Sequence, residues 1–342
     1  MRSLALGLVL GITAMMATLA GIGVARAADS AVILQYHRFG EPDLPSTSVT
    51  IEQFEGHIRH LQESGYSVLP VPHIIAALKA GQPLPERAIG ITIDDAARST
   101  FTVAWPRLQA AGFPFTVFVS TDAVDQRHRR TMSWEDIREL AAAGVTIGNH
   151  SAAHDHMWEM DEAARQADLN RAERRFREEL GFAPGLFAYP YGEFDLALRY
   201  MVTERGFDAA FGQQSGVAHQ SWDSSALPRF ALNENYGDLD RFRLIAATLP
   251  LIAIDITPQN PVLTNNPPHI GFTLDPSLSE YADKLACFAS GQGQSSVDVL
   301  GAQRVEVRLT QPFPAGRNRV NCTMPGPDDR WRWLGLQFIA PQ

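Results

Sequence analysis

Acidic and imidazole side chains follow two short apolar runs in a pattern that suits metal chemistry. Asp94 and Asp95 directly follow one run, and His150 and His154 lie four residues apart just after another. Two histidines and one carboxylate form a ligand set typical of catalytic zinc sites, which leave positions open for water and substrate. A second carboxylate beside such a water can act as a general base.

Each motif alone also has an ordinary structural explanation. An Asp-Asp pair is typical of a solvated turn, and a His-x-x-x-His pair is common on surfaces. The four-residue spacing of His150 and His154 predicts one turn of helix, which would bring both imidazoles to the same side. The side chains of Asp94 and Asp95 are expected to diverge, so that one binds the metal and the other faces its water.

Strands and helices alternate over residues 31–255, which predicts βα units and a parallel sheet. Thr50, with Gln53 three residues later, and Ser133 are expected to cap helices. The expected strands are 32–36, 66–69, 89–93, 115–119, 145–148, 186–189 and 209–211, and the expected helices are 50–61, 74–79, 101–111, 134–143, 162–180 and 196–205. About seven units favour a barrel over an open sheet, and no Gly-x-Gly-x-x-Gly follows the first strand.

The polar residues named above follow expected strands, and so do two further motifs. In a βα barrel the functional side chains stand at the carboxyl ends of the strands. His37 follows the first strand, and Tyr189-Pro190-Tyr191-Gly192 ends the strand at 186–189. Four strands therefore bring candidate residues to one rim of the predicted barrel.

Three of these motifs resemble those of polysaccharide deacetylases, the NodB-type domain of carbohydrate esterase family 4. Thr92-Ile93-Asp94-Asp95 resembles the family's Thr-Phe-Asp-Asp, His150-Ser151-x-x-His154 is similar to its His-Ser/Thr-x-x-His zinc motif, and Tyr189-Pro190-Tyr191-Gly192 resembles its Arg-x-Pro-Tyr. The resemblance covers about residues 30–257. It implies a distorted (β/α)7 barrel that removes acetyl groups from a polysaccharide containing N-acetylglucosamine.

The resemblance also implies roles for individual residues. Asp94 would be the general base, and Asp95, His150 and His154 would hold a divalent metal ion, for which zinc is expected. The backbone N–H of Tyr191 would help hold the oxyanion of the reaction, as preorganised donors do.

Two departures from the family pattern bear on the remaining roles. No arginine precedes Tyr189-Pro190, and residues 251–256 lack the histidine that usually supplies the general acid. One permuted branch, the poly-N-acetylglucosamine deacetylases, has that histidine after the first strand, and Gln35-Tyr36-His37-Arg38 resembles this element. We therefore expect His37 to be the general acid, the alternative being a strand-end histidine that contacts backbone. Arg229 is expected to pair with Asp94 and tune its pKa, the alternative being a surface arginine.

The N-terminal segment resembles an export signal. Residues 1–27 contain a long uncharged run from Leu4 to Ala25, and the small-x-small pattern Ala25-Arg26-Ala27 that follows is typical of a signal peptide cleaved after Ala27. We expect a secreted or periplasmic protein without a membrane span after cleavage. The alternative is an uncleaved anchor, because the apolar run is long enough to span a bilayer.

The C-terminal part of the chain has a different pattern from the barrel. We expect the barrel to occupy residues 28–257, a proline-rich linker 258–268, and a small all-β sandwich 269–342. In an oxidising compartment, Cys287 and Cys322 are expected to form a disulfide, the alternative being two buried thiols. Trp331 and Trp333 share one face of the last strand, which either packs against the barrel or stacks on sugar rings.

Composition narrows the classes of function. The chain has 342 residues, 45% of them hydrophobic, and a formal net charge of −9. Its apolar content suffices for a folded core, and its acid excess argues against nucleic acid as a partner. A metal-dependent carbohydrate N-deacetylase is the leading hypothesis. The alternatives are a non-catalytic glycan-binding protein on the same scaffold and an amidase that acts on another amide.

Overall fold

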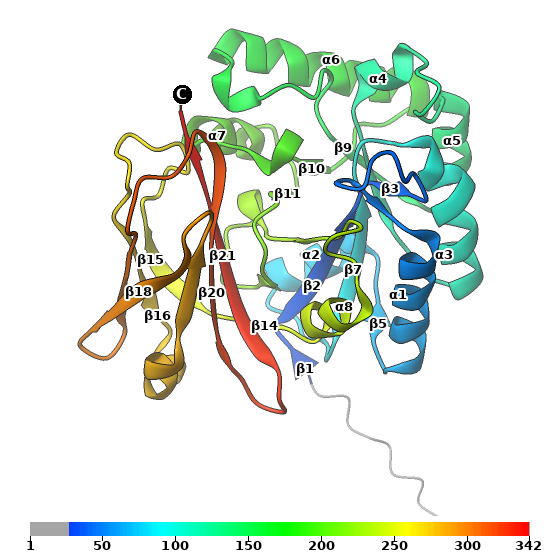
Figure 1. Ribbon diagram of the computed structural model, residues 1–342. Coiled ribbons are helices and arrows are strands. Elements are labelled where there is room, and N and C mark those ends of the chain that lie inside the picture. Colours follow the sequence, from blue (N-terminus) through cyan, green and yellow to red (C-terminus); the bar gives the residue numbers. More distant parts are fainter. Residues whose placement is uncertain (1–26, 342) are drawn as a thin grey trace, which may run out of the picture.

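The computed structural model describes residues 27–341 and has two parts that lie side by side, an α/β barrel and a second, all-β part (Figure 1). The predicted signal peptide lies outside the described residues, except for Ala27. Within residues 27–341, no helix is both long enough and apolar enough to cross a membrane.

Parallel strands form the wall of the barrel, in the order β13, β2, β7, β8, β9, β10, β11. Their bounds are β2 (Ser30–Tyr36), β7 (Ala88–Ile93), β8 (Thr116–Val119), β9 (Thr146–Asn149), β10 (Leu186–Ala188), β11 (Ala209–Phe211) and β13 (Phe230–Ala231). Two short strands add to the wall, with β5 (Ser67–Val68) parallel to β7 and β12 (Ala218–His219) antiparallel to β2. The predicted distorted α/β barrel is confirmed.

Helices cover the outside of the wall. They are α1 (Ile51–Glu63), α2 (Val71–Lys79), α3 (Trp105–Ala111), α4 (Thr121–Asp125), α5 (Trp134–Ala142), α6 (Glu162–Leu180), α7 (Leu196–Glu204) and α8 (Leu239–Ala246). Thr50 and Ser133 cap α1 and α5 as predicted, each within a reciprocal capping box. The helix expected at 101–111 begins as a π-helical segment, Thr100–Ala104, which continues into α3.

Short elements complete the barrel at its two ends. The strand pairs are β1 (Ala27–Ala28) with β6 (Leu84–Pro85) and β3 (Arg38–Phe39) with β4 (Ser48–Val49). The 3-10 turns of the chain are Met157–Glu159, Pro190–Gly192, Ser224–Ala226 and, in the all-β part, Pro276–Lys284.

The barrel closes through a short segment that carries Arg229. On one side, the Leu227 N–H donates to the Ala210 oxygen at 2.9 Å, and the Gly212 N–H donates to the Leu227 oxygen at 3.0 Å. On the other side, β13 pairs with β2. Arg229 therefore lies in the seam between the first and last strands of the wall.

The second part is a curled eight-stranded sheet, in the order β14, β21, β20, β17, β18, β19, β16, β15. The bounds are β14 (Leu249–Pro250), β15 (Ala253–Thr257), β16 (Ile270–Leu274), β17 (Ala286–Ala289), β18 (Gly293–Leu300), β19 (Arg304–Arg308), β20 (Gly316–Pro325) and β21 (Trp331–Ala340). The first half of β18 pairs with β17 and the second half with β19, so the sheet folds into two layers around one apolar core. The predicted sandwich is confirmed.

The predicted disulfide is also present. Cys287 and Cys322 are fully buried and lie directly opposite each other on β17 and β20. The bond therefore joins neighbouring strands of one layer inside the apolar core.

The pairing of β14 and β15 corrects the predicted domain boundary. β15 pairs with β16, and β14 pairs with β21, so residues 249–257 lie in the second sheet rather than in the barrel. The stretch predicted as a linker is also held in place, because the Leu263 N–H donates to the Ile339 oxygen at 2.8 Å and Leu263 is buried. Proline content marked this segment correctly as non-helical, but it packs along the sheet.

Strand β21 lies on the side of the second sheet that is turned to the barrel (Figure 1). Its even-numbered residues from Leu334 to Phe338 enter the core of the sheet, and the odd-numbered ones face the barrel. The Trp333 ring packs edge-on against Phe230, with the ring centres 5.4 Å apart, and Gly335 leaves no room for a Cβ beside Ser215. The Trp333 face therefore packs against the barrel.

A buried histidine links α1, β2 and the start of α8, and it makes stability depend on pH. The His57 Nε2–H donates to the Gly237 oxygen at 2.7 Å, and its Nδ1 accepts from the Tyr36 hydroxyl at 3.1 Å. Burial lowers the pKa of His57 to about 4. Because the unfolded chain binds this proton more readily, the stability linked to His57 is complete above about pH 6.5 and is lost as the pH falls towards 4.

We expect acidification from pH 7 to 4.5 to cost the wild type up to about 3 kcal/mol through His57. Urea unfolding of wild type and His57→Gln at both pH values measures this contribution, because glutamine retains a donor but does not titrate. Equal pH dependence of the two proteins would show that His57 is not the group responsible.

Candidate active site

Asp94 stands at the carboxyl end of β7 and is fully buried. Arg229 donates to both of its oxygens at 2.8 Å, and Gln35 donates to Oδ2 at 2.7 Å. Burial raises the pKa of this carboxyl, but the charge and hydrogen bonds of Arg229 outweigh burial and leave the pKa below its ordinary value. The predicted pairing of Arg229 with Asp94 is therefore present, and it keeps the carboxylate ionised.

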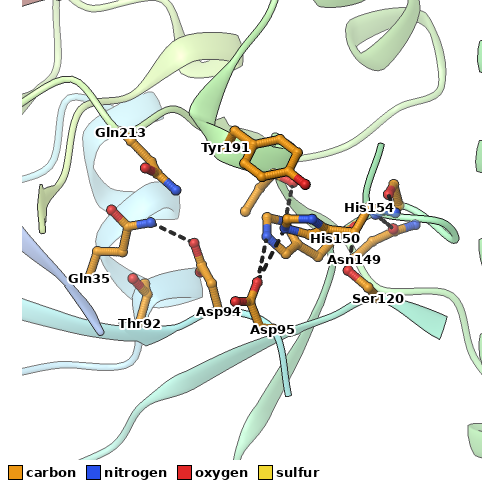
Figure 2. Close-up of polar contacts among 12 residues, drawn as sticks. Gln35, Thr92, Asp94, Asp95, Ser120, Asn149, His150, His154, Tyr191 and Gln213 are labelled. Carbon is orange, nitrogen blue, oxygen red and sulfur yellow. Dashed lines mark hydrogen bonds and ion pairs between the residues drawn. The ribbon is translucent and has the colours of Figure 1, made fainter. Parts of the chain in front are cut away.

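Asp95 turns away from Asp94, as predicted. Its backbone is left-handed, with φ 74°, and the residue after it is left-handed as well. Its Oδ1 lies 3.5 Å from the His150 Nε2 and 3.3 Å from the His154 Nε2 (Figure 2). The three predicted ligand residues therefore meet at one point, although they come from two strand ends far apart in the sequence.

The helix turn predicted for His150 to His154 is wrong. The two residues lie in an irregular loop after β9, in which Ser151 and His154 are left-handed, with φ of 65° and 59°. Side chains replace the helical hydrogen bonds, since Asn149 Oδ1 accepts from the Ser151 N–H at 2.8 Å and Ser151 Oγ accepts from the His154 N–H at 3.0 Å. The loop still places the two imidazole centres 4.8 Å apart.

The chemistry of this cluster fits a divalent cation. The Asp95 Oδ1 and His150 Nε2 atoms are buried without a hydrogen-bond partner, which is costly unless a ligand satisfies them. The His150 Nδ1–H donates to the Ala188 oxygen at 2.7 Å, which leaves the lone pair of Nε2 facing Asp95. The candidate ligand atoms of Asp95, His150 and His154 all lie within 4.8 Å of one another. Two imidazoles and one carboxylate suit zinc and several other divalent ions.

Tyr191 lies over the two histidines, on the turn after β10 (Figure 2). Its backbone is left-handed, with φ 57°, and its ring centre is 4.6 Å from that of His154. On the other side the Tyr191 ring stacks on His156, whose Nδ1 is 2.6 Å from the buried Glu193 carboxylate. This turn is therefore held rigidly against the candidate metal site.

The second sheet reaches the same turn. The Arg317 guanidinium of β20 donates to the Tyr191 oxygen and, at 3.0 Å, to Gln213 Oε1. Gln337 of β21 donates to the Gly192 oxygen at 2.6 Å. The turn that carries Tyr191 is thus clamped by two side chains that come from outside the barrel.

His37 follows β2, whose last residue pairs with the last residue of β7. The Asp94 N–H continues this ladder by donating to the Tyr36 oxygen at 2.9 Å, which brings His37 next to Asp94. Burial lowers the pKa of His37, and the charges of Asp95 and Asp94 partly oppose that shift. The predicted residues His37, Asp94, Asp95, His150, His154, Tyr191 and Arg229 therefore gather at one end of the barrel.

Sequence reasoning missed the residues that support this set. Asp168 of α6 accepts from the N–H groups of Ala152 and Ala153, at 2.8 and 3.0 Å, and so holds the histidine loop. Asp168 adjoins the apolar stripe of α6 and is 3% exposed. An acidic residue beside such a stripe can be recognised in the sequence as a candidate buried carboxylate. Gln213 and Arg317 carry no such signal, because only the folded chain brings them to the site.

The barrel region of this chain is similar to several known proteins. Residues 81–210 match the model of the family described as polysaccharide deacetylase. The chain is 26% identical over 233 residues to the poly-beta-1,6-N-acetyl-D-glucosamine N-deacetylase of Escherichia coli K12, covering 55% of this chain and 34% of that protein. It is 22% identical over 233 residues to the enzyme of the same name from Staphylococcus aureus MRSA252, covering 60% of this chain and 80% of that one. The chain thus spans only about a third of the E. coli relative.

Solved structures share the fold of the barrel. The structure of IcaB from Ammonifex degensii superposes with a TM-score of 0.56 at 24% identity, covering 64% of this chain and 98% of that one. The Streptococcus pyogenes deacetylase PplD superposes with a TM-score of 0.58 at 16% identity, covering 63% and 96%. The family model covers residues 81–210, the segment that carries Asp94, Asp95, His150, His154 and Tyr191, and this segment is therefore of the polysaccharide deacetylase type.

Proposed function

We propose that this protein is a metal-dependent hydrolase that removes N-acetyl groups from a polysaccharide containing N-acetylglucosamine. One observation supports this most strongly: a buried, ionised Asp94 adjoins a three-residue ligand set with two unpartnered atoms. A base next to an open metal site is what hydrolysis of an unactivated amide requires.

Asp95, His150 and His154 would hold the metal ion. Such an ion polarises a carbonyl oxygen and lowers the pKa of a water molecule bound to it. Asp94 accepts the proton of the attacking water, and Arg229 keeps its carboxylate ionised and oriented. The Tyr191 N–H donates to the oxygen on which negative charge develops. His37 then donates a proton to the nitrogen as the C–N bond breaks, which yields acetate and a free amine.

The two alternatives make different demands on the site. A glycan-binding protein without activity has no need of an ionised base against a metal site, and burying Asp94 with Arg229 in an apolar barrel is costly without a purpose. An amidase acting on another amide would use the same residues, so only its substrate differs. The names of the relatives support N-acetylglucosamine polymers.

We also propose that the protein acts outside the cytoplasm. The Cys287–Cys322 disulfide supports this, since such bonds persist in oxidising compartments. The signal-like N-terminal segment points the same way.

Acetate release tests the proposed function. The full-length protein, loaded with zinc, is assayed on β-1,6-linked N-acetylglucosamine oligomers, chitin oligomers and peptidoglycan. We expect release from at least one of these N-acetylated polymers. A protein that binds metal but releases acetate from none of them would refute the deacetylase.

Replacing His37 tests its role separately. A protonated imidazole is the donor, so activity that depends on His37 falls as the pH rises through its pKa, which burial holds below the usual 6.5. His37→Ala is expected to lower kcat by about 100-fold or more and to abolish this alkaline decline. A His37→Ala protein with wild-type kcat would remove His37 from the mechanism.

A further inference from the structure

In the described part of the chain, three arginines lack a carboxylate ion-pair partner, and one of them, Arg317, contacts the Tyr191 turn. Arg317 and Arg319 are two residues apart on β20, so their side chains project from the same face of that strand, which is turned to the barrel. Arg241 belongs to α8 of the barrel. Within residues 27–341, none of the three forms an ion pair with a carboxylate, whereas arginines such as Arg165 and Arg175 do.

Arg317 lies at the edge of the catalytic end of the barrel. Its Nη1 donates to the Tyr191 oxygen and to Gln213 Oε1, and the residue is exposed. No hydrogen bond or ion pair in the described chain uses its Nη2 or Nε. This second edge of the guanidinium is therefore available to a ligand that lies over the Tyr191 turn.

Arg319 is the arginine on which the charges of both Arg317 and Arg241 act. Its Nε is buried without a hydrogen-bond partner. Burial and the neighbouring charges of Arg317 and Arg241 lower its pKa to about 10, so that it remains charged at neutral pH. Arg241 donates to the Tyr236 oxygen at 2.6 Å and lies 5.1 Å from the centre of the Tyr236 ring, which is 55% exposed.

The carboxylates that act electrostatically on Arg317 and Arg241 are engaged elsewhere. Glu193, which acts electrostatically on Arg317, accepts from Trp158 and contacts His156. Asp238, which acts on Arg241, caps α8 by accepting from the Arg241 N–H at 2.9 Å. Arg319 is thus repelled by both Arg317 and Arg241, in a chain whose formal net charge is −9.

We propose that Arg317, Arg319 and Arg241 form a subsite for a carboxylate on the polysaccharide, carried by a sugar close to the N-acetylated one. A carboxylate relieves the repulsion among the three charges, and a guanidinium fork matches its two oxygens. Through Arg317, the bound anion also stabilises the turn that carries Tyr191. This inference rests on the proposed function for the polysaccharide nature of the ligand. It extends that function to acidic polymers.

Direct binding tests the subsite without relying on turnover. Isothermal titration of the zinc-loaded protein compares two oligosaccharides of equal length, one alternating N-acetylglucosamine with glucuronate and one of neutral β-1,6-linked N-acetylglucosamine. We expect the acidic one to bind roughly tenfold more tightly, and Arg319→Gln to remove this preference. Arg308→Gln is the matched control, because Arg308 lies on β19 and pairs with Asp298 within its own sheet.

The outcomes separate the subsite from the deacetylase. Equal affinity of the wild type for both oligosaccharides, no binding of the acidic one, or an unchanged preference in Arg319→Gln would each overturn the subsite. Arg319→Lys keeps the charge but not the two-pronged guanidinium, and it is expected to retain part of the preference for the acidic oligosaccharide. Such partial retention excludes misfolding as the cause of the loss in Arg319→Gln. Acidic preference without acetate release from any polymer would instead refute the deacetylase and leave the subsite standing.

Discussion

Asp94→Asn is expected to abolish acetate release and to destabilise the barrel at the same time. Removing a general base costs about 100- to 10,000-fold in rate. The same change leaves the fully buried Arg229 without its counter-charge, and breaking a buried ion pair in this way costs about 3–5 kcal/mol. Acetate release and urea unfolding of the same preparation measure the two effects.

A second substitution separates the two effects of Asp94→Asn. Adding Arg229→Met removes the orphaned charge, so the double variant is expected to regain much of the lost stability but none of the activity. Asp125→Asn is the matched control, because Asp125 pairs with Arg175 at the surface and its loss is expected to cost about 1 kcal/mol or less. An Asp94→Asn protein as stable as wild type would contradict the argument from burial, and one that releases acetate would contradict the role of base.

Replacing a proposed metal ligand is expected to have the second large effect, a loss of zinc affinity. The chelated and reloaded wild type is expected to bind one divalent ion per chain. Alanine at Asp95, His150 or His154 is expected to lower the affinity for zinc by more than about 100-fold, since even the outer partners of metal ligands contribute 10- to 100-fold. Zinc content after dialysis measures this without reference to activity. The rise in Tm on adding zinc should disappear in the same variants.

His156→Ala is the control for the metal site. His156 lies two residues after His154 but faces Glu193 and the Tyr191 ring rather than Asp95. We therefore expect His156→Ala to keep the zinc affinity of the wild type, even if it disturbs the Tyr191 turn. Equal loss of zinc in His156→Ala and His154→Ala would mean that the ligand set is wrong.

Local sequence patterns predicted the residues at strand ends well. Apolar runs located β2, β7, β9 and β10 to within two residues, and the parallel arrangement then required their carboxyl ends to meet. Asp94, Asp95 and both histidines are therefore readable without a structure. The backbone conformation between His150 and His154 could not be predicted in the same way. Left-handed residues stabilised by the Ser151 side chain fit the same four-residue spacing of the histidines as a helix turn does.

Contacts between distant segments lay beyond the reach of local patterns. Arg229 is 135 residues from Asp94, and family resemblance rather than periodicity suggested the pair. Arg317 and Gln337 reach the Tyr191 turn only because β20 and β21 pack along the barrel. The predicted domain boundary is wrong for a related reason, since the strand partners of residues 249–257 are β16 and β21, which lie further along the chain.

The segment that closes the barrel has a consequence for how this protein can evolve. The seam residue Arg229 needs Asp94 as its counter-charge, so the group proposed to abstract a proton is also part of the structural joint between the first and last strands. A descendant that loses activity by a single change at Asp94 would also lose much of its stability. Drift from this barrel towards a binding protein therefore passes through two coupled substitutions, or first through loss of the metal ligands, whose replacement leaves the seam intact.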